Sequence, residues 1–169
     1  MIFKLFKKWS FYRLPWFILA LSALSFELAA LYFQYVKLLE PCVMCVYERT
    51  AILGILISAL IAITGPRVLI LRFIGAIGFL ASSSWGFALA WHHTQLQLHP
   101  SPFATCSPYP NFPEWLKLNQ WFPFMFQPHG DCSAVVWKML NWSMPQWLIL
   151  SFAIYMVIAI VILAGQFRK

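Results

Sequence analysis

The residues best suited to chemistry are four cysteines, which fall into two pairs of different spacing. Cys42 and Cys45 form a Cys-x-x-Cys motif that follows Pro41 and opens a long apolar segment. Two such thiols at a helix N-terminus can close a small disulfide ring, and the helix dipole there stabilises the thiolate that attacks disulfides. An inert stapling disulfide is the weaker interpretation, because a bond this local constrains little of the chain. The motif therefore predicts a redox centre.

The second pair, Cys106 and Cys132, lies 26 positions apart in a long stretch rich in proline. Alone, these residues would indicate an ordinary structural disulfide of an oxidising compartment. Together with the Cys-x-x-Cys motif they make two redox couples, which can pass electrons by thiol–disulfide exchange. Structural zinc sites favour two short Cys/His clusters, and the sequence lacks the second one, so we expect no metal.

Charged and titratable residues accompany the Cys-x-x-Cys motif. Arg49 lies four residues after its second cysteine, so both project from one face of a helix. An arginine at a membrane edge is costly unless paired or solvated; it would bind an electronegative ligand, pair with Glu48 or snorkel to the headgroups. His93 and its neighbour His92 can exchange protons near neutral pH, although a histidine at a helix end is more often structural. Glu27 lies within an apolar segment, and its role stays open.

The composition indicates that lipid is the solvent of this chain. Of 169 residues, 62% are hydrophobic and only 10% are charged, whereas soluble domains are about 45–50% apolar and about 25% charged. Four segments are long and apolar enough to span a bilayer: 14–36, 45–64, 73–91 and 147–165. The basic residues before the first segment also suit a signal peptide, but its apolar run is too long and no clear cleavage site follows. We expect an all-α integral membrane protein, a bundle of four transmembrane helices forming one membrane domain over residues 1–169.

The basic residues predict the orientation of the bundle. Eight fall on one side of the predicted spans: Lys4, Lys7, Lys8, Arg13, Arg67, Arg72, Arg168 and Lys169. Four fall on the other: Lys37, Arg49, Lys117 and Lys138. This asymmetry places both termini in the cytoplasm and the loops 37–44 and 92–146 outside, with all four cysteines. The net charge of +7 thus reflects topology rather than a basic domain, and we expect no nucleic-acid partner.

The loop 92–146 differs in kind from the apolar segments. It holds eight of the eleven prolines, so most of it cannot form regular helix or sheet. Pro113 suits a helix start and Pro123 would end that helix. Between them, Trp115, Leu118 and Phe122 recur at helical spacing. This pattern predicts a short helix lying in the headgroup layer, although the aromatic residues would equally suit a cover over the top of the bundle.

Small residues in the third apolar segment predict close helix packing. Gly78, Ser82 and Gly86 recur at four-residue spacing. Small residues at such spacing allow the backbones of neighbouring membrane helices to approach closely. We interpret this stripe as structural.

Several ordered motifs resemble those of the bacterial disulfide bond formation protein B family, DsbB, and the resemblance covers nearly the whole chain. The matching runs are Leu24-Ser25-Phe26-Glu27-Leu28, Pro41-Cys42-Val43-Met44-Cys45-Val46-Tyr47-Glu48-Arg49, Pro100-Ser101-Pro102-Phe103-Ala104-Thr105-Cys106, Phe112-Pro113-Glu114-Trp115, Gly130-Asp131-Cys132 and Met144-Pro145-Gln146-Trp147. The resemblance implies a four-helix bundle in the bacterial inner membrane, with its redox cysteines in the periplasm. It also implies an enzyme that reoxidises DsbA, a periplasmic thioredoxin-like oxidase, and passes two electrons to a membrane quinone, ubiquinone or menaquinone.

The resemblance also implies roles for individual residues. In the family pattern, Cys106 of the pair Cys106–Cys132 takes the mixed disulfide with DsbA. Cys132 then engages Cys42 of the pair Cys42–Cys45, and Cys45 meets the quinone, which Arg49 helps to hold. The remaining matches are His93, a histidine near the quinone, Glu48, which flanks the arginine, and Glu27, an acid of the first helix.

Other functions compete with this one. A paralogue dedicated to one oxidase and one substrate would carry the same motifs. A quinone coupling like that of vitamin K epoxide reductases also combines a Cys-x-x-Cys motif with loop cysteines on four helices. A non-enzymatic scaffold would use its disulfides only to staple the loop, and its thiols would not cycle with quinone.

Overall fold

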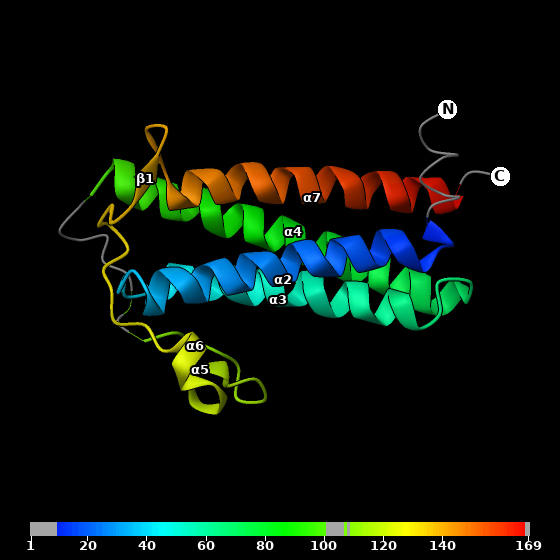
Figure 1. Cartoon of the computed structure of the whole chain (residues 1–169), viewed down its shortest axis with the longest axis horizontal. Coiled ribbons are helices and arrows are strands. Elements are labelled where there is room, and N and C mark those ends of the chain that lie inside the picture. The colour runs from blue at the N-terminus through cyan, green and yellow to red at the C-terminus, as the bar shows by residue number, and fades with distance from the viewer. Residues whose placement is uncertain (1–9, 101–106, 108, 168–169) are drawn as a thin grey trace.

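The computed structural model describes residues 10–100, 107 and 109–167. In chain order its elements are α2 (Arg13–Tyr35), α3 (Val43–Thr64), α4 (Leu69–Leu98), α5 (Leu118–Trp121), α6 (Pro123–Phe126), β1 (Lys138–Met139), β2 (Trp142–Ser143) and α7 (Met144–Phe167). The four long helices pack along one another in a bundle (Figure 1), and each is long and apolar enough to cross a membrane. The predicted all-α bundle of four membrane-spanning helices is confirmed.

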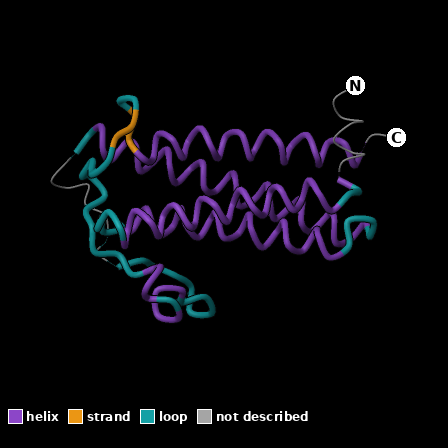
Figure 2. Tube along the Cα trace, in the orientation of Figure 1, coloured by secondary structure: helices purple, strands orange, loops and turns teal. Residues whose placement is uncertain are grey.

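The connections divide between the two ends of the bundle. The start of α2, the short turn between α3 and α4 and the last turns of α7 lie at one end. The link between α2 and α3 and the long segment between α4 and α7 lie at the other, where most of the irregular chain gathers (Figure 2). We call this second end the loop end. The first thiol pair lies at the start of α3, and Cys132 belongs to the same buried cluster as Cys42.

The third long helix extends beyond the apolar segment 73–91 at both ends. At its start, buried Arg72 donates from Nη1 to the Pro66 carbonyl at 2.8 Å and from Nε to Gln166 Oε1 at 2.9 Å. At its far end, His93 and Thr94 are buried although both are polar. Because partners within the bundle satisfy these polar side chains, the helix continues past the point where its apolar run stops.

The small residues of α4 contact two neighbouring helices. A Cβ atom on Gly78 would lie 2.5 Å from Ser58 Oγ of α3, whereas one on Gly86 would collide with the ring of Phe152 of α7. A four-residue step overshoots one full helical turn by about 40°, so a stripe at this spacing winds slowly around the helix. The predicted stripe of small residues therefore packs against α3 at Gly78 and against α7 at Gly86.

The first and last helices meet near the middle of the bundle through Tyr155 of α7. Its hydroxyl donates to Ser22 Oγ of α2 at 3.0 Å. Its ring packs edge-on against Phe26 of α2 and Phe79 of α4, with centroids 6.1 and 5.9 Å away. These contacts join three helices and close the bundle on this side.

The helix predicted between Pro113 and Pro123 has different bounds in the structure. The chain turns near Glu114, α5 begins only at Leu118, and α6 begins at Pro123 itself. Pro123 has no amide hydrogen to continue α5, but its fixed φ suits the first turn of a new helix. The predicted aromatic stripe is also wrong, because Leu118 is buried while Trp115 is exposed.

The two short helices are docked onto the bundle. Leu118 of α5 and Phe126 of α6 form a buried cluster with Val46 of α3. The Phe124 carbonyl accepts hydrogen bonds from Gln34 Nε2 at 3.0 Å and from the Tyr35 hydroxyl at 2.6 Å, both near the end of α2. This part of the outer loop is therefore tied to the helices that frame the thiol pair.

Enlarging Gly86 should destabilise the contact between α4 and α7. We expect Gly86→Val to lower the free energy of unfolding by about 1–3 kcal/mol, because the fully buried ring of Phe152 has little room to move away. Thermal unfolding in detergent micelles would measure the loss. Ala88→Val, at an exposed position of the same helix, is the matched control. Equal melting temperatures for the two variants would contradict this packing.

Candidate functional site

The site begins where α3 begins. Cys42 is the N-cap of α3, in an extended conformation (φ −84°, ψ 171°), and its sulfur accepts a hydrogen bond from the Cys45 amide at 3.2 Å. The two sulfur atoms lie 2.6 Å apart, and both thiols are free. The pair can therefore pass between dithiol and disulfide with little movement of the backbone.

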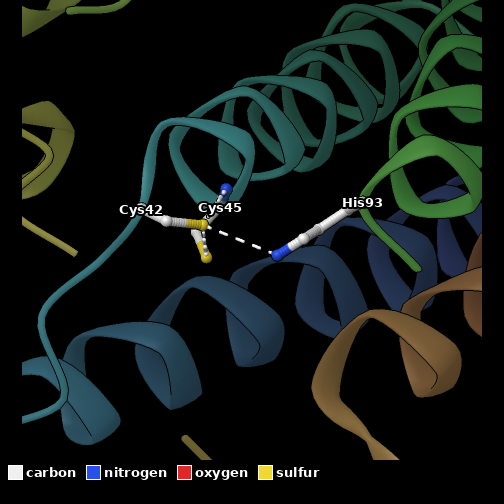
Figure 3. Close-up of side chains that lie close together, drawn as sticks. All are labelled: Cys42, Cys45 and His93. Atoms are coloured by element: carbon white, nitrogen blue, oxygen red, sulfur yellow. Dashed lines mark hydrogen bonds between the residues drawn. The ribbon is translucent and has the colours of Figure 1, made fainter. Parts of the chain in front are cut away.

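His93 of α4 reaches across to this thiol pair (Figure 3). Its Nε2 lies 3.6 Å from Cys42 Sγ, and its Nδ1 lies 2.9 Å from Glu48 Oε1. Both His93 and Glu48 are buried. Glu48, one possible partner of Arg49 by sequence, thus pairs with His93 instead. The result is a line of polar atoms that runs from a sulfur through an imidazole to a carboxylate.

Arg49 turns toward α2, away from His93, and is held by neutral acceptors. Its Nη1 donates to Gln34 Oε1 at 2.6 Å and to the Met125 carbonyl at 2.8 Å, while Nη2 donates to the Ala30 carbonyl at 3.0 Å. The side chain is buried, so it does not snorkel to the headgroups. Three of its five N–H donors are engaged in these bonds, and its positive charge is not neutralised by them.

Glu27 lies on α2, three residues before the Ala30 carbonyl that accepts from Arg49. The carboxyl group is buried, and within the described part of the chain neither of its oxygens has a hydrogen-bond partner. Its electrostatic interaction with Arg49 is attractive. These observations place Glu27 near the site without giving it a contact to the thiols.

A cavity of about 360 Å³ opens beside the thiol pair, between α2, α3, α7 and the outer loop. We call it the apolar cavity. Most of its wall is hydrophobic, including Phe26 and Phe33 of α2 and Trp137 of the loop. Cys45, Glu48 and Arg49 supply polar atoms to the same wall. Its size and its few polar groups are typical of sites for small apolar ligands.

A second cavity, of about 330 Å³, lies on the loop side of the thiols. This loop-side cavity is lined by Cys42, Cys45 and His93, and by Gly130 and Asp131 of the outer loop. Cys45 therefore borders both cavities. Cys42 borders the loop-side cavity and is not among the described residues that line the apolar one.

The loop segment that carries Cys132 runs alongside the start of α3. The amides of His129 and Gly130 donate to the Pro41 carbonyl at 2.9 and 3.0 Å, and Gly130 pairs with Cys42 in a β-bridge. A Cβ atom on Gly130 would lie 2.5 Å from the Glu40 carbonyl oxygen, so only glycine permits this close approach.

Cys132 is thereby brought to the first thiol pair. It belongs to the same buried cluster as Cys42, and its backbone hydrogen-bonds to the His93 ring. Cys132 is disulfide-bonded in this structure. Backbone and side-chain hydrogen bonds from Ser133 hold the pKa of Asp131 below its ordinary value, which keeps a negative charge beside this cysteine. Cys106 lies outside the described residues.

The thiols and His93 also have the chemistry to hold a metal ion. One ligand atom each from Cys42, Cys45 and His93 lies within 4.8 Å of the others. Spacing along the chain does not predict this cluster, because His93 lies 48 positions after Cys45 and joins the motif only where α3 and α4 pack together. The close approach of Gly130 was also not predicted, although Gly130 precedes Asp131 and Cys132 in one motif.

Comparison with known proteins identifies relatives of this chain. A sequence model of the family described as "Disulfide bond formation protein DsbB" matches residues 12–162. A disulfide bond formation protein B of Psychromonas ingrahamii is 54% identical over 88% of this chain and 80% of its own length. Proteins of the same name from Shewanella frigidimarina and Yersinia enterocolitica are 52% and 50% identical, each over 93% of this chain, covering 93% and 89% of their own lengths.

These matches extend over all four membrane-spanning helices and over both stretches that carry the cysteines. Agreement of this extent confirms the resemblance that the sequence motifs indicated. The chain belongs to the DsbB family of disulfide bond formation proteins, and it is a disulfide-generating thiol–disulfide oxidoreductase.

Proposed function

We propose that the protein reoxidises DsbA through a relay of two disulfides and passes the electrons to ubiquinone or menaquinone in the apolar cavity. One observation carries this proposal. Cys45 and Arg49 share the wall of the apolar cavity, while Cys42 faces the loop segment that carries Cys132. The thiol pair thus adjoins an apolar ligand site on one side and an exchange partner on the other.

The apolar cavity fits a quinone ring. A flat, mostly apolar ring with two carbonyl oxygens suits a hydrophobic wall that carries one buried cation, because the guanidinium can hydrogen-bond to a carbonyl. When bound, a quinone supplies an acceptor for two electrons. Arg49 would hold and orient it through donors not used by Gln34, Ala30 and Met125, and Cys45 would face it. Glu48 would bring a carboxyl group to the same wall.

The energetics favour such an acceptor. DsbA is a strong oxidant with a reduction potential of about −120 mV, so a glutathione pool near −200 mV cannot withdraw its electrons. An acceptor dissolved in the bilayer escapes this limit. It also accounts for thiols placed at the end of a membrane-spanning helix, beside a cavity formed by membrane helices.

The family pattern and the positions of Cys42, Cys45 and Cys132 support one order of the relay. The mixed disulfide with DsbA forms at Cys106, which releases Cys132 as the attacking thiolate. Cys132 then bonds to Cys42 and displaces the Cys45 sulfur, which faces the apolar cavity. The second DsbA thiol resolves the mixed disulfide and frees Cys106, which bonds again to Cys132 and releases Cys42 as a thiol. The β-bridge between Gly130 and Cys42 supports this order, because it keeps the second loop cysteine close to the outer sulfur of the pair.

The orientation in the bacterial inner membrane is part of the same proposal. The α3–α4 turn carries Arg67, and both chain termini carry basic residues, so that end of the bundle faces the cytoplasm. The loop end then faces the periplasm, where disulfides persist. DsbA can reach the loop cysteines only from that side.

The central experiment supplies the purified protein with reduced DsbA and a quinone and follows quinone absorbance. We expect quinone reduction that is coupled to oxidation of DsbA, and none with Cys45→Ser, because that variant lacks the sulfur facing the apolar cavity. A non-enzymatic scaffold would leave the quinone oxidised. A paralogue dedicated to another oxidase would turn over with a different thioredoxin-like partner and not with DsbA.

Replacing Arg49 should weaken quinone binding more than folding. We expect Arg49→Gln to raise the apparent KM for quinone by about tenfold or more, because hydrogen bonds to charged groups contribute about 1.5–3 kcal/mol. Arg49→Lys should retain only part of the affinity for quinone, since lysine lacks the planar fork of donors. Arg67→Gln, an exposed arginine at the opposite end of the bundle, is the control. An unchanged KM in both Arg49 variants would refute the assigned role.

The relay order can be trapped in a chain with two cysteines. Cys45→Ser with Cys106→Ser leaves Cys42 and Cys132, which should form one bridge on oxidation because they share a buried cluster. Mass spectrometry of the digested protein would detect it. Cys42→Ser with Cys106→Ser is the matched control, and its Cys45 should bridge to Cys132 much more slowly. Two persistently free thiols in the first variant would favour direct attack by the partner on the Cys-x-x-Cys pair.

A further inference from the structure

The relay leaves the fate of the protons open. Oxidising two thiols to a disulfide releases two electrons and two protons, and reducing a quinone to a quinol consumes two of each. Cys45 lines the apolar cavity and lies near the acceptor. Of these two cavities, Cys42 lines only the loop-side cavity, so its proton has a longer path to the acceptor. This inference rests on the proposed function.

A continuous polar path connects Cys42 to the apolar cavity. Cys42 Sγ lies 3.6 Å from His93 Nε2, and His93 Nδ1 lies 2.9 Å from Glu48 Oε1. Glu48 in turn lines the apolar cavity, whereas His93 lines the loop-side cavity. The imidazole therefore lies between residues of the two cavities, with one nitrogen toward the Cys42 thiol and the other toward the Glu48 carboxyl group. Figure 3 shows the side of the ring that faces the thiol pair.

We propose that His93 is the acid–base group for Cys42 and that Glu48 conducts the proton onward to the apolar cavity. As Cys42 attacks to form its bond with Cys45, His93 Nε2 accepts the Cys42 proton, and Nδ1 passes a proton to Glu48. The Cys42–Cys45 bond replaces the two S–H bonds, and a bound quinone would accept the two electrons together with the proton held by Glu48. The second proton comes from the Cys45 thiol, so the two thiols and the quinone balance.

Polar groups from two elements surround the imidazole. From α3, Cys42 and Cys45 lie beside His93, and the Glu48 carboxyl group is in hydrogen-bond contact with it. From the outer loop, the Cys132 backbone hydrogen-bonds to the ring, and ionised Asp131 borders the same cavity. Two further ionisable groups line these cavities in the described part of the chain: Glu40, which lines both, and Arg49, which lines the apolar cavity.

A purely structural ion pair between α3 and α4 would also bury His93 against Glu48. The two roles differ in their effect on the Cys42 sulfur. An imidazole that accepts the thiol proton stabilises the thiolate, so removing it must shift ionisation of Cys42 to higher pH. A structural pair would leave that ionisation unchanged while lowering stability.

The first test measures ionisation of Cys42 without quinone. A chain with Cys45→Ser, Cys106→Ser and Cys132→Ser keeps one thiol, whose reaction with the small reagent methyl methanethiosulfonate is followed by mass spectrometry across a pH series. We expect His93→Gln in this background to raise the pH of half-maximal rate by about one unit or more, and Glu48→Gln to raise it less. His92→Gln, an exposed neighbour, should cause no shift.

The plateau rate at high pH distinguishes a change in the ionisation of Cys42 from a change in the fold. There the thiol is fully ionised in every variant, so an unchanged plateau means that access to Cys42 is unchanged. An equal midpoint in His93→Gln and in the parent chain would overturn the acid–base role. Glu48→Asp, which keeps a carboxylate, should recover part of the midpoint shift, and Glu48→Gln should not.

The second test concerns delivery of the proton to the apolar cavity, in the chain with all four cysteines. Glu48→Gln should slow quinone reduction most at pH 6 to 7, and the deficit should shrink at higher pH as solvent base in the loop-side cavity takes the proton. A deficit independent of pH would overturn the path through Glu48. If the parent protein did not reduce quinone while the midpoint shift appeared, the proposed function would fail and the acid–base role of His93 would stand.

Discussion

The structure depends on the polar partners that the buried side chains of Glu48 and Arg49 find within the membrane bundle. Glu48 and Arg49 are adjacent on α3, yet they project about 100° apart around the helix and meet different neighbours. Glu48 reaches His93 of α4, while Arg49 reaches Gln34 and a carbonyl of α2. Leaving either charge unpaired would be costly in this environment. These two sets of contacts fix the start of α3, and with it the thiol pair, relative to both flanking helices.

The same requirement recruits the outer loop. Arg49 also donates to the Met125 carbonyl, and the β-bridge at Gly130 lays the chain before Cys132 along the start of α3. A long loop with many prolines would otherwise pay a large entropic cost to keep one cysteine beside another. Backbone hydrogen bonds and a buried cation hold it in place without regular secondary structure. The loop thus becomes part of the site.

How much the sequence could predict follows from the range of each interaction. Local composition and spacing determine the membrane spans, the Cys-x-x-Cys motif and the position of Arg49. These features can therefore be predicted from the sequence. The partner of Glu48 is not, because His93 lies 45 residues away and meets it only after α3 and α4 pack. The bounds predicted for the helix between Pro113 and Pro123 were wrong for a related reason. Leu118 is held by contact with Val46 of α3, and not by a helix start at Pro113.

The two cavities explain why the thiols lie where they do. Disulfide exchange needs a polar environment in which a thiolate can form and a loop cysteine can approach. An apolar acceptor needs a hydrophobic cavity instead. Because Cys45 borders both cavities, electrons can pass from the loop-side cavity to the apolar cavity through its sulfur, with little movement of the backbone. Protons do not follow sulfur bonds, and they need a chain of titratable groups instead. The line from Cys42 through His93 to Glu48 crosses the same boundary beside the thiols, and in this way one helix start serves both kinds of transfer.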